Sequence, residues 1–316
     1  MAKFGKELGI FTLLVVLCIF VTSMNPLFLS AANLQNTGRL IGMFGILSLG
    51  LSVVIVTGGI DLSVGSLVAL LGTLLAIGLV DRRLPPVTVL AGVLLTGALV
   101  GGWHAFLITR CKLQPFIATL CGLLIYRGIA RFIAGDETKG FGNAEGFGWL
   151  KELATGSLLG VPNPFILLIV LAAGLWVLLH RSVFGRYLYA IGRNEEAARF
   201  SGVNTRVVEA TAYMLAASFT AIAAVLFAFY TNSVSPSSHG NFYELYGIAA
   251  AVLGGFSLRG GEGTVIGVLL GAVLLQVLQN LVNLLGIPSS LNFAVMGTVI
   301  LLGVLADSLM RRRRTT

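Results

Sequence analysis

Long apolar runs separated by short polar breaks dominate this chain from one end to the other. A bilayer core about 30 Å thick needs roughly 20 apolar residues for one helical crossing. The pattern therefore predicts about ten membrane-spanning helices within a single transmembrane domain, residues 1–316. We place these helices at residues 8–23, 40–57, 62–80, 86–109, 113–134, 164–180, 208–230, 246–256, 264–285 and 291–310.

Two of these runs need separate comment. Residues 246–256 are too few for a straight crossing and end at Gly254 and Gly255, so we expect a broken helix or an earlier start. The first run follows Lys3 and Lys6 but no A-x-A-like cleavage site follows it, which favours a retained span over a signal peptide.

Composition and charge fit the same class of protein. The chain is 56% hydrophobic and 11% charged, with a mean hydropathy of +0.94, whereas an ordinary soluble domain has about 25% charged residues. A large soluble domain is excluded, and the fold class is an all-α, polytopic membrane helical bundle. The net charge of +8 is explained by orientation, because basic residues concentrate in alternate connections and mark the cytoplasmic side. Both termini are then cytoplasmic, and nucleic acid is not an expected partner.

Two further arginines lie inside the fifth predicted span. Arg127 and Arg131 are one turn apart near its outer end. We expect both long side chains to snorkel to the membrane interface.

The segment of residues 181–207 is basic, polar and long enough to form structure of its own. Asn194 is a good N-cap, Glu195 and Glu196 suit the positive end of a helix dipole, and Gly202 suits a C-terminal stop. We predict a short helix of about seven residues, roughly 10 Å long. Because such a helix is unstable alone, it is either an ordinary loop helix packed on the bundle or a docking element for a cytoplasmic partner.

A second break joins the second and third spans. Gly58 and Gly59 end one helix, and Asp61 precedes the next together with Ser63. A carboxylate here either caps the following helix or serves as an ion or substrate ligand at membrane depth.

The ninth predicted span carries two patterns. Gly263, Gly267 and Gly271 recur at spacings of four and predict close helix contact. Four amides then follow on one face, where they either bond neighbouring helices or line a path for a neutral polar solute. These amides are Gln276, Gln279, Asn280 and Asn283.

Motifs for catalysis are missing from the sequence. The Gly5-Lys6 pair is followed by Glu7, so there is no phosphate-binding G-x-x-x-x-G-K-[ST] loop. The three histidines are scattered and the three cysteines form no C-x-x-C pair. We therefore expect no catalytic, metal or cofactor site, and a transport role rather than an enzyme.

With these residues in hand, the chain closely resembles the membrane permease subunits of bacterial ABC sugar importers of the ribose type. The resemblance covers nearly the whole chain. It is carried by residues 58–66 (GGIDLSVGS), 114–120 (QPFIATL), 185–204, 249–255, 260–263 (GGEG) and 283–286 (NLLG).

This resemblance implies a type II ABC importer-like fold in the bacterial inner membrane and an ATP-driven import of a ribose-like pentose or hexose. It implies as partners an ABC ATPase subunit that uses ATP-Mg, a second permease copy or a related permease, and an external sugar-binding protein. The ATPase coupling residues would be Arg186, Gly192, Asn194, Glu195, Glu196, Ala197, Ala198, Arg199 and Gly202. The candidate path residues are Asp61, Ser63, Gln276, Gln279, Asn280 and Asn283.

One position departs from the pattern of similar permeases. They typically have an acid where this chain has Tyr246, which leaves the identity of the sugar open. Two other functions stay open at this point: an ATP-independent facilitator or secondary carrier of a small polar solute, and a branched-chain amino-acid permease of related architecture.

Overall fold

Bilayer-length helices make up most of the molecule. The computed structural model describes residues 5–142 and 145–288, with residues 291, 294, 295, 297, 298 and 301 as isolated positions. Within this part of the chain, eight helices are long and apolar enough to cross a membrane. They are α1 (Gly5–Met24), α2 (Ala31–Ile55), α3 (Val64–Ala76) with its π-helical extension η2 (Ile77–Asp81), α4 (Pro86–Thr109), α5 (Pro115–Ala134), α7 (Asn163–Arg181), α10 (Thr205–Thr231) and α12 (Val265–Leu284).

Short elements connect these helices. They are the 3-10 turn η1 (Pro26–Leu29) and the helices α6 (Gly148–Thr155), α8 (Val183–Arg193), α9 (Glu195–Phe200) and α11 (Tyr243–Leu253). Strand β1 (Lys139–Gly140) pairs antiparallel with β4 (Ser233–Val234), and β2 (Ser157–Leu158) pairs antiparallel with β3 (Val161–Pro162). Since each strand has only two residues, the prediction of an all-α membrane bundle is confirmed.

Nine of the ten predicted spans coincide with a helix, and the tenth, residues 291–310, falls largely outside the described residues. The largest boundary difference is at α2, which begins at Ala31 although its apolar run begins near residue 40. The Ser30 hydroxyl accepts a hydrogen bond from the backbone N–H of Asn33 (3.3 Å) and starts the helix in polar sequence. As expected for residues 246–256, α11 starts earlier and has only 11 residues.

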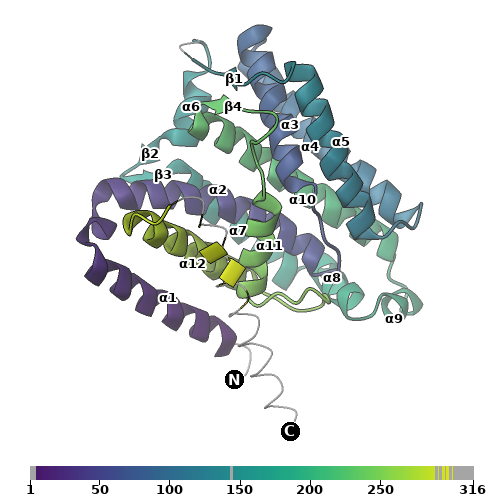
Figure 1. The fold of residues 1–316 in the computed structure, drawn as a ribbon. Helices are drawn as coiled ribbons and strands as arrows, with labels where there is room; N and C mark the ends of the chain where they lie inside the picture. Colours follow the sequence, from purple (N-terminus) through teal and green to yellow (C-terminus); the bar gives the residue numbers. More distant parts are fainter. Residues whose placement is uncertain are drawn as a thin grey trace.

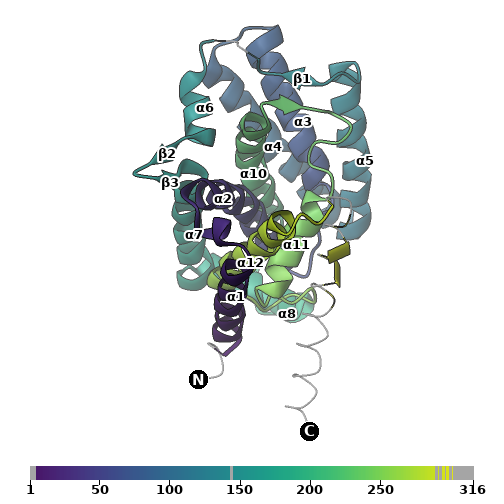
Figure 2. The same ribbon diagram turned by 60° about the vertical axis from the view of Figure 1, so that its left-hand side comes forward.

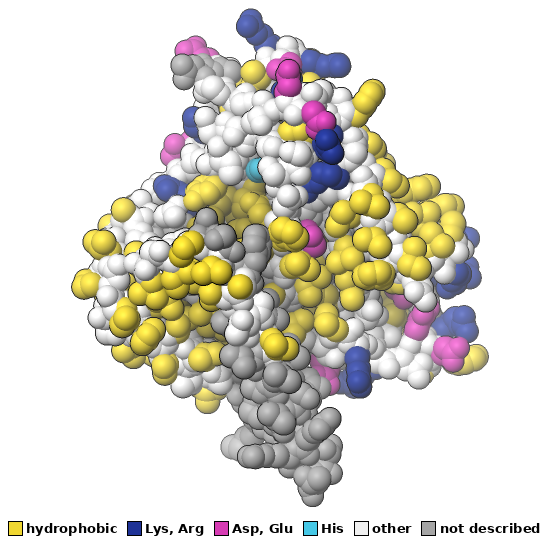
Figure 3. Space-filling model, in the orientation of Figure 1, with side chains coloured by type: hydrophobic (Ala, Val, Ile, Leu, Met, Phe, Trp, Pro, Cys, Tyr) yellow, Lys and Arg dark blue, Asp and Glu magenta, His cyan; other side chains and the backbone are white. Residues whose placement is uncertain are grey.

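The short elements lie at two opposite ends of the bundle (Figure 1). We call the end that holds α6, β1 and β4 the α6 end, and the end that holds α8 and α9 the α8 end. Charged side chains gather at both ends of the face in Figure 3, with apolar side chains across the band between them. At the α6 end, the Lys139 ammonium lies 3.4 Å from the Asp81 carboxylate and ties β1 to the tip of η2.

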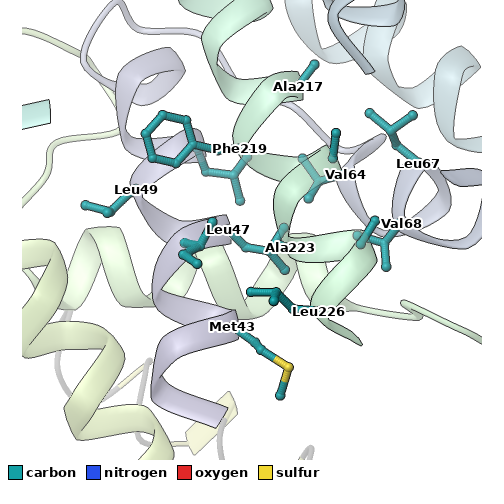
Figure 4. Close-up of a cluster of buried hydrophobic side chains, with 14 of the residues drawn as sticks. Met43, Leu47, Leu49, Val64, Leu67, Val68, Ala217, Phe219, Ala223 and Leu226 are labelled. Atoms are coloured by element: carbon teal, nitrogen blue, oxygen red, sulfur yellow. The ribbon is translucent and has the colours of Figure 1, made fainter. Parts of the chain in front are cut away.

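Helices α2 and α10 form the centre of the core. Residues 41–56 are buried on every side of α2, as is typical of a helix surrounded by protein. Figure 4 shows Met43 and Leu47 of α2 beside Ala223 and Leu226 of α10. Figure 2, turned by 60°, shows α3, α4 and α5 on one side of this centre and α1 and α12 on the other.

Glycines allow the close helix contact predicted for the ninth span. A Cβ at Gly267 would lie 2.0 Å from the carbonyl oxygen of Gly254, and a Cβ at Gly271 would lie 2.0 Å from that of Ala250. The backbones of α11 and α12 therefore touch directly. Gly263 lies before α12, in a turn where its φ of +137° favours glycine.

We predict that Gly271→Leu lowers the stability of the folded permease, because the new side chain must push α11 away from α12. Overpacking of this kind costs about 1–3 kcal/mol. Thermal unfolding in detergent measures the effect, with Gly102→Leu on α4 as the matched control, since nothing lies within 4 Å of a Cβ there. Equal melting temperatures for the two variants would contradict the close contact.

Candidate coupling surface and translocation path

Helix α9 forms at the α8 end as the sequence predicts, with six residues. Its N-cap is Asn194, whose side-chain oxygen accepts a hydrogen bond from the backbone N–H of Ala197 (2.9 Å). Gly202 lies two residues after the end of α9. Its φ of +85° is the left-handed conformation that commonly follows the end of a helix. The short capped helix is therefore confirmed.

Helix α8, which contains Arg186, is the part of this segment that the sequence analysis missed. The Ser182 hydroxyl caps it by accepting a hydrogen bond from the N–H of Gly185 (3.0 Å). Leu188 and Ile191, one turn apart, are both buried against the bundle. The apolar spacing is that of an amphipathic helix, and these side chains hold the segment of residues 181–207 against the membrane helices.

Gly192 lies at the junction between α8 and two other loops. A Cβ there would lie 1.9 Å from the carbonyl oxygen of Val56 and 2.3 Å from the nitrogen of Gly261. The same Gly261 N–H donates to the Val56 carbonyl (2.8 Å). Three segments therefore meet backbone to backbone here: the end of α8, the end of α2, and the loop before α12.

Tyr189 adds a side-chain contact at this junction. Its hydroxyl donates a hydrogen bond to the carbonyl oxygen of Gly263 (2.8 Å). Burial raises the pKa of Tyr189 to about 12, so the phenol stays protonated and keeps donating throughout the physiological range.

Ala198 of α9 is 5% exposed and packs on the bundle. The other residues of α9 are open to solvent. Glu195 accepts a hydrogen bond from the Thr205 hydroxyl (3.2 Å). Phe200 is 83% exposed at the end of the helix. The sequence analysis did not single out this phenylalanine, although an aromatic residue in a polar segment is a usable signal. The other exposed residues are Arg193, Asn194, Glu195, Glu196, Ala197, Arg199, Ser201 and Gly202.

A cavity of about 920 Å³ lies beside this junction, bounded by α1, α7, α8 and the loop before α12. Arg186 and Arg193 line it from α8, and Trp176 lines it from α7. Glu7 of α1 also lines it and accepts a hydrogen bond from the Thr264 hydroxyl. The predicted coupling residue Arg186 thus faces a space between the first helix and the coupling segment.

Asp61 lies in the turn before α3 and is only 2% exposed. One carboxylate oxygen accepts hydrogen bonds from the backbone N–H (2.9 Å) and the hydroxyl (2.7 Å) of Ser63. The other oxygen lies 4.0 Å from Nδ1 of His104 in α4, and Nε2 of that histidine lies 3.0 Å from the Tyr126 hydroxyl of α5. Asp61 and Ser63 are enclosed within this chain, and their role in a path stays a prediction.

The four amides of α12 have different surroundings. Asn280 exchanges two hydrogen bonds with Asn33 of α2, at 2.7 and 3.0 Å. Gln276 and Gln279 each have a buried side-chain oxygen that has no hydrogen-bond partner among the described residues. Asn283 is exposed near the end of the helix. Of these four amides, Asn280 bonds a neighbouring helix. That the four amides line a translocation path stays a prediction.

Arg127 does not snorkel, which corrects the expectation for this residue. Its guanidinium donates to the carbonyl oxygens of Pro236 (3.0 Å) and His239 (2.7 Å), in the loop between β4 and α11. Arg131 does turn outward, where it forms a two-bonded pair with Asp136. The hydrogen bond from this arginine lowers the pKa of Asp136 below its usual value.

Tyr246, which replaces the acid of similar permeases, is buried in α11. Its ring packs on Phe44 of α2, with centroids 5.1 Å apart. The same phenylalanine also contacts Tyr243 and Phe227. At this position the chain therefore has an aromatic contact between α11 and α2.

Comparison with known proteins identifies the relatives of the chain. Residues 33–304 match the protein family described as branched-chain amino acid transport system / permease component. The chain is 40% identical to the ribose import permease protein RbsC of Bacillus subtilis (strain 168), over 97% of this chain and 93% of that protein. It is 37% identical to RbsC of Escherichia coli (strain K12), over 93% and 91% of the two chains.

A xylose permease is similar over the same extent. The xylose transport system permease protein XylH of Escherichia coli (strain K12) is 32% identical, over 95% of this chain and 91% of that protein. No solved structure matches the chain.

We predict that Asn280→Leu destabilises the permease by about 1 kcal/mol, because Asn33 loses both hydrogen bonds to Asn280 and keeps its side-chain bond to the Phe28 carbonyl oxygen. The double variant Asn33→Leu/Asn280→Leu should recover part of this loss, which a double-mutant cycle of thermal unfolding measures. The exposed Asn283→Leu is the control and should melt like the parent protein. Strictly additive losses would show that the two amides do not stabilise each other.

Proposed function

Because the chain belongs to the branched-chain amino acid transport system permease component family, and is similar to ribose and xylose permeases over more than nine-tenths of its length, we propose that it carries a monosaccharide as the membrane subunit of an ATP-driven importer. A ribose-like pentose or a hexose is the proposed substrate. The similarity to two sugar permeases favours a sugar over a branched-chain amino acid.

In this proposal the protein lies in the bacterial inner membrane with its α8 end in the cytoplasm. Arg110, Lys112, Arg206 and Arg259 lie at the α8 end together with the arginines of α8 and α9. Lysine and arginine in short connections favour the cytoplasmic side. Both termini are proposed to be cytoplasmic as well.

The ATPase subunit docks on the exposed face of α9 and the end of α8. A docking site needs an anchor side chain that loses its exposure on binding, and Phe200 supplies one, with charged residues around it. ATP-Mg is bound and hydrolysed by the ATPase, and the permease binds no cofactor. A second permease, identical or related, and an external sugar-binding protein complete the importer.

The Gly192 junction transmits movement from this surface to the membrane helices. An ATP-dependent change acts on the permease only through contacts that differ between two states. Since α8 touches the end of α2 and the loop before α12 backbone to backbone, displacement of α8 must move at least one of them. This contact is the observation that carries the proposal of coupling.

We predict that purified permease reconstituted in liposomes takes up radiolabelled D-ribose only together with its ATPase, its sugar-binding protein and ATP. The permease alone should give the background rate of empty liposomes, because its passage opens only when the ATPase moves α8. Uptake down a gradient by the permease alone would contradict the importer and favour a facilitator.

We predict that Phe200→Ala and Glu196→Lys each lower ATP-driven uptake at least tenfold while the permease remains folded, because both residues lie on the proposed docking face. Uptake by the reconstituted importer and melting of the isolated permease are the two measurements. Phe132→Ala is the matched control, since Phe132 is 86% exposed on the membrane helix α5, far along the chain from α9. If Phe200→Ala transports at the rate of the parent protein, α9 is not the docking surface.

A further inference from the structure

The chain between β4 and α11 lies inside the bundle at membrane depth. Val234 of β4 lies against Gly72 of α3, and Gly240 lies against Gly65 of the same helix. Between these two contacts the loop runs antiparallel to α3 for roughly 10 Å, at 1.5 Å per helical residue. Figures 1 and 2 both show this descent from β4 to the start of α11.

Arg127 places the same loop within the span of α5. The arginine lies seven residues before the end of that helix and holds the carbonyl groups of Pro236 and His239. Its helical neighbours Leu124 and Ile125 are 66% and 51% exposed, as expected for a lipid-facing surface. The loop of residues 235–242 is therefore non-helical backbone at the depth of a lipid-contacting helix.

The two sides of this loop differ in burial and polarity. Pro236, His239 and Gly240 are buried toward the bundle. The exposed residues are the polar Ser237, Ser238 and Asn241, together with Phe242 at the end of the loop. Hydroxyl and amide groups cannot face lipid without a large cost, and irregular backbone at this depth occurs where it is buried in protein or lines a water-filled cavity.

One buried nitrogen of the loop also lacks a partner among the described residues. His239 is 8% exposed, and its Nε2 has no hydrogen-bond partner among the described residues. A buried polar atom of this kind requires a partner such as water.

We propose that residues 235–242 form the wall of the water-filled passage, with Ser237, Ser238 and Asn241 as the groups that contact the sugar during its crossing. Hydroxyl and amide groups both donate and accept hydrogen bonds without charge, which matches the hydroxyls of a neutral monosaccharide. Arg127 is a positioning residue, because it fixes the loop through two carbonyl groups and leaves the polar side open. The contact with sugar rests on the proposed function, whereas the wet wall does not.

The wet wall is tested by cysteine labelling in a permease whose Cys18, Cys111 and Cys121 are replaced by serine. Ser238→Cys and Asn241→Cys are each compared with Leu124→Cys, the lipid-facing control on the helix that holds the loop. In open membrane fragments, a charged thiosulfonate reagent should label the two loop cysteines at least tenfold faster than the control. Equal rates at all three positions would overturn the passage, whatever the function of the protein.

The sugar contact is tested in the complete importer. Asn241→Leu should lower D-ribose uptake at least tenfold, while ATP hydrolysis stimulated by the binding protein stays within twofold of the parent rate. Thr96→Leu on α4 is the control for an exposed polar group replaced by leucine. If Asn241→Leu takes up D-ribose at the parent rate, the proposed sugar contact is wrong. If the importer with the unmodified permease takes up no D-ribose, the proposed function is wrong. The labelling result does not depend on either outcome.

Discussion

The hydrocarbon interior of a bilayer offers no hydrogen-bond partner to a protein backbone, and each irregular segment of this permease within the bundle is arranged around that constraint. In the loop of residues 235–242, the Arg127 guanidinium supplies the donors for two carbonyl groups. In the break between α2 and α3, the Asp61 carboxylate accepts the N–H and hydroxyl of Ser63. The side chains of Arg127 and Asp61 thus stabilise two of the places where the helical pattern stops inside the bundle.

The same constraint explains the use of glycine at the helix contacts. Because lipid is as apolar as a leucine side chain, helices in a membrane gain little from hydrophobic contact and more from close backbone approach. Gly97 and Gly101 bring α4 onto α10, and Gly267 and Gly271 bring α12 onto α11. Gly192 extends this type of contact beyond the membrane helices to α8. Helix α8 is therefore connected to the bundle by a backbone contact at Gly192 as well as by its buried side chains.

The apolar runs predicted nine helices because run length alone distinguishes a crossing from a loop. The cap at Asn194 was equally predictable, since capping depends on residues next to each other in the sequence. Contacts between distant segments were not predictable. The pair of Asn280 with Asn33 and the inward turn of Arg127 depend on which helices become neighbours in the fold. No local pattern in the sequence carries that information.

Helix α11 connects the two regions to which we assign function. Its first residue follows the loop that we propose as the passage wall, and its last residues lead into the loop that meets Gly192. A helix of 11 residues is roughly 16 Å long. Its contact with α12 is made directly by backbone at Gly267 and Gly271. In the proposed importer, movement of α8 by the ATPase would reach the polar loop through this short helix.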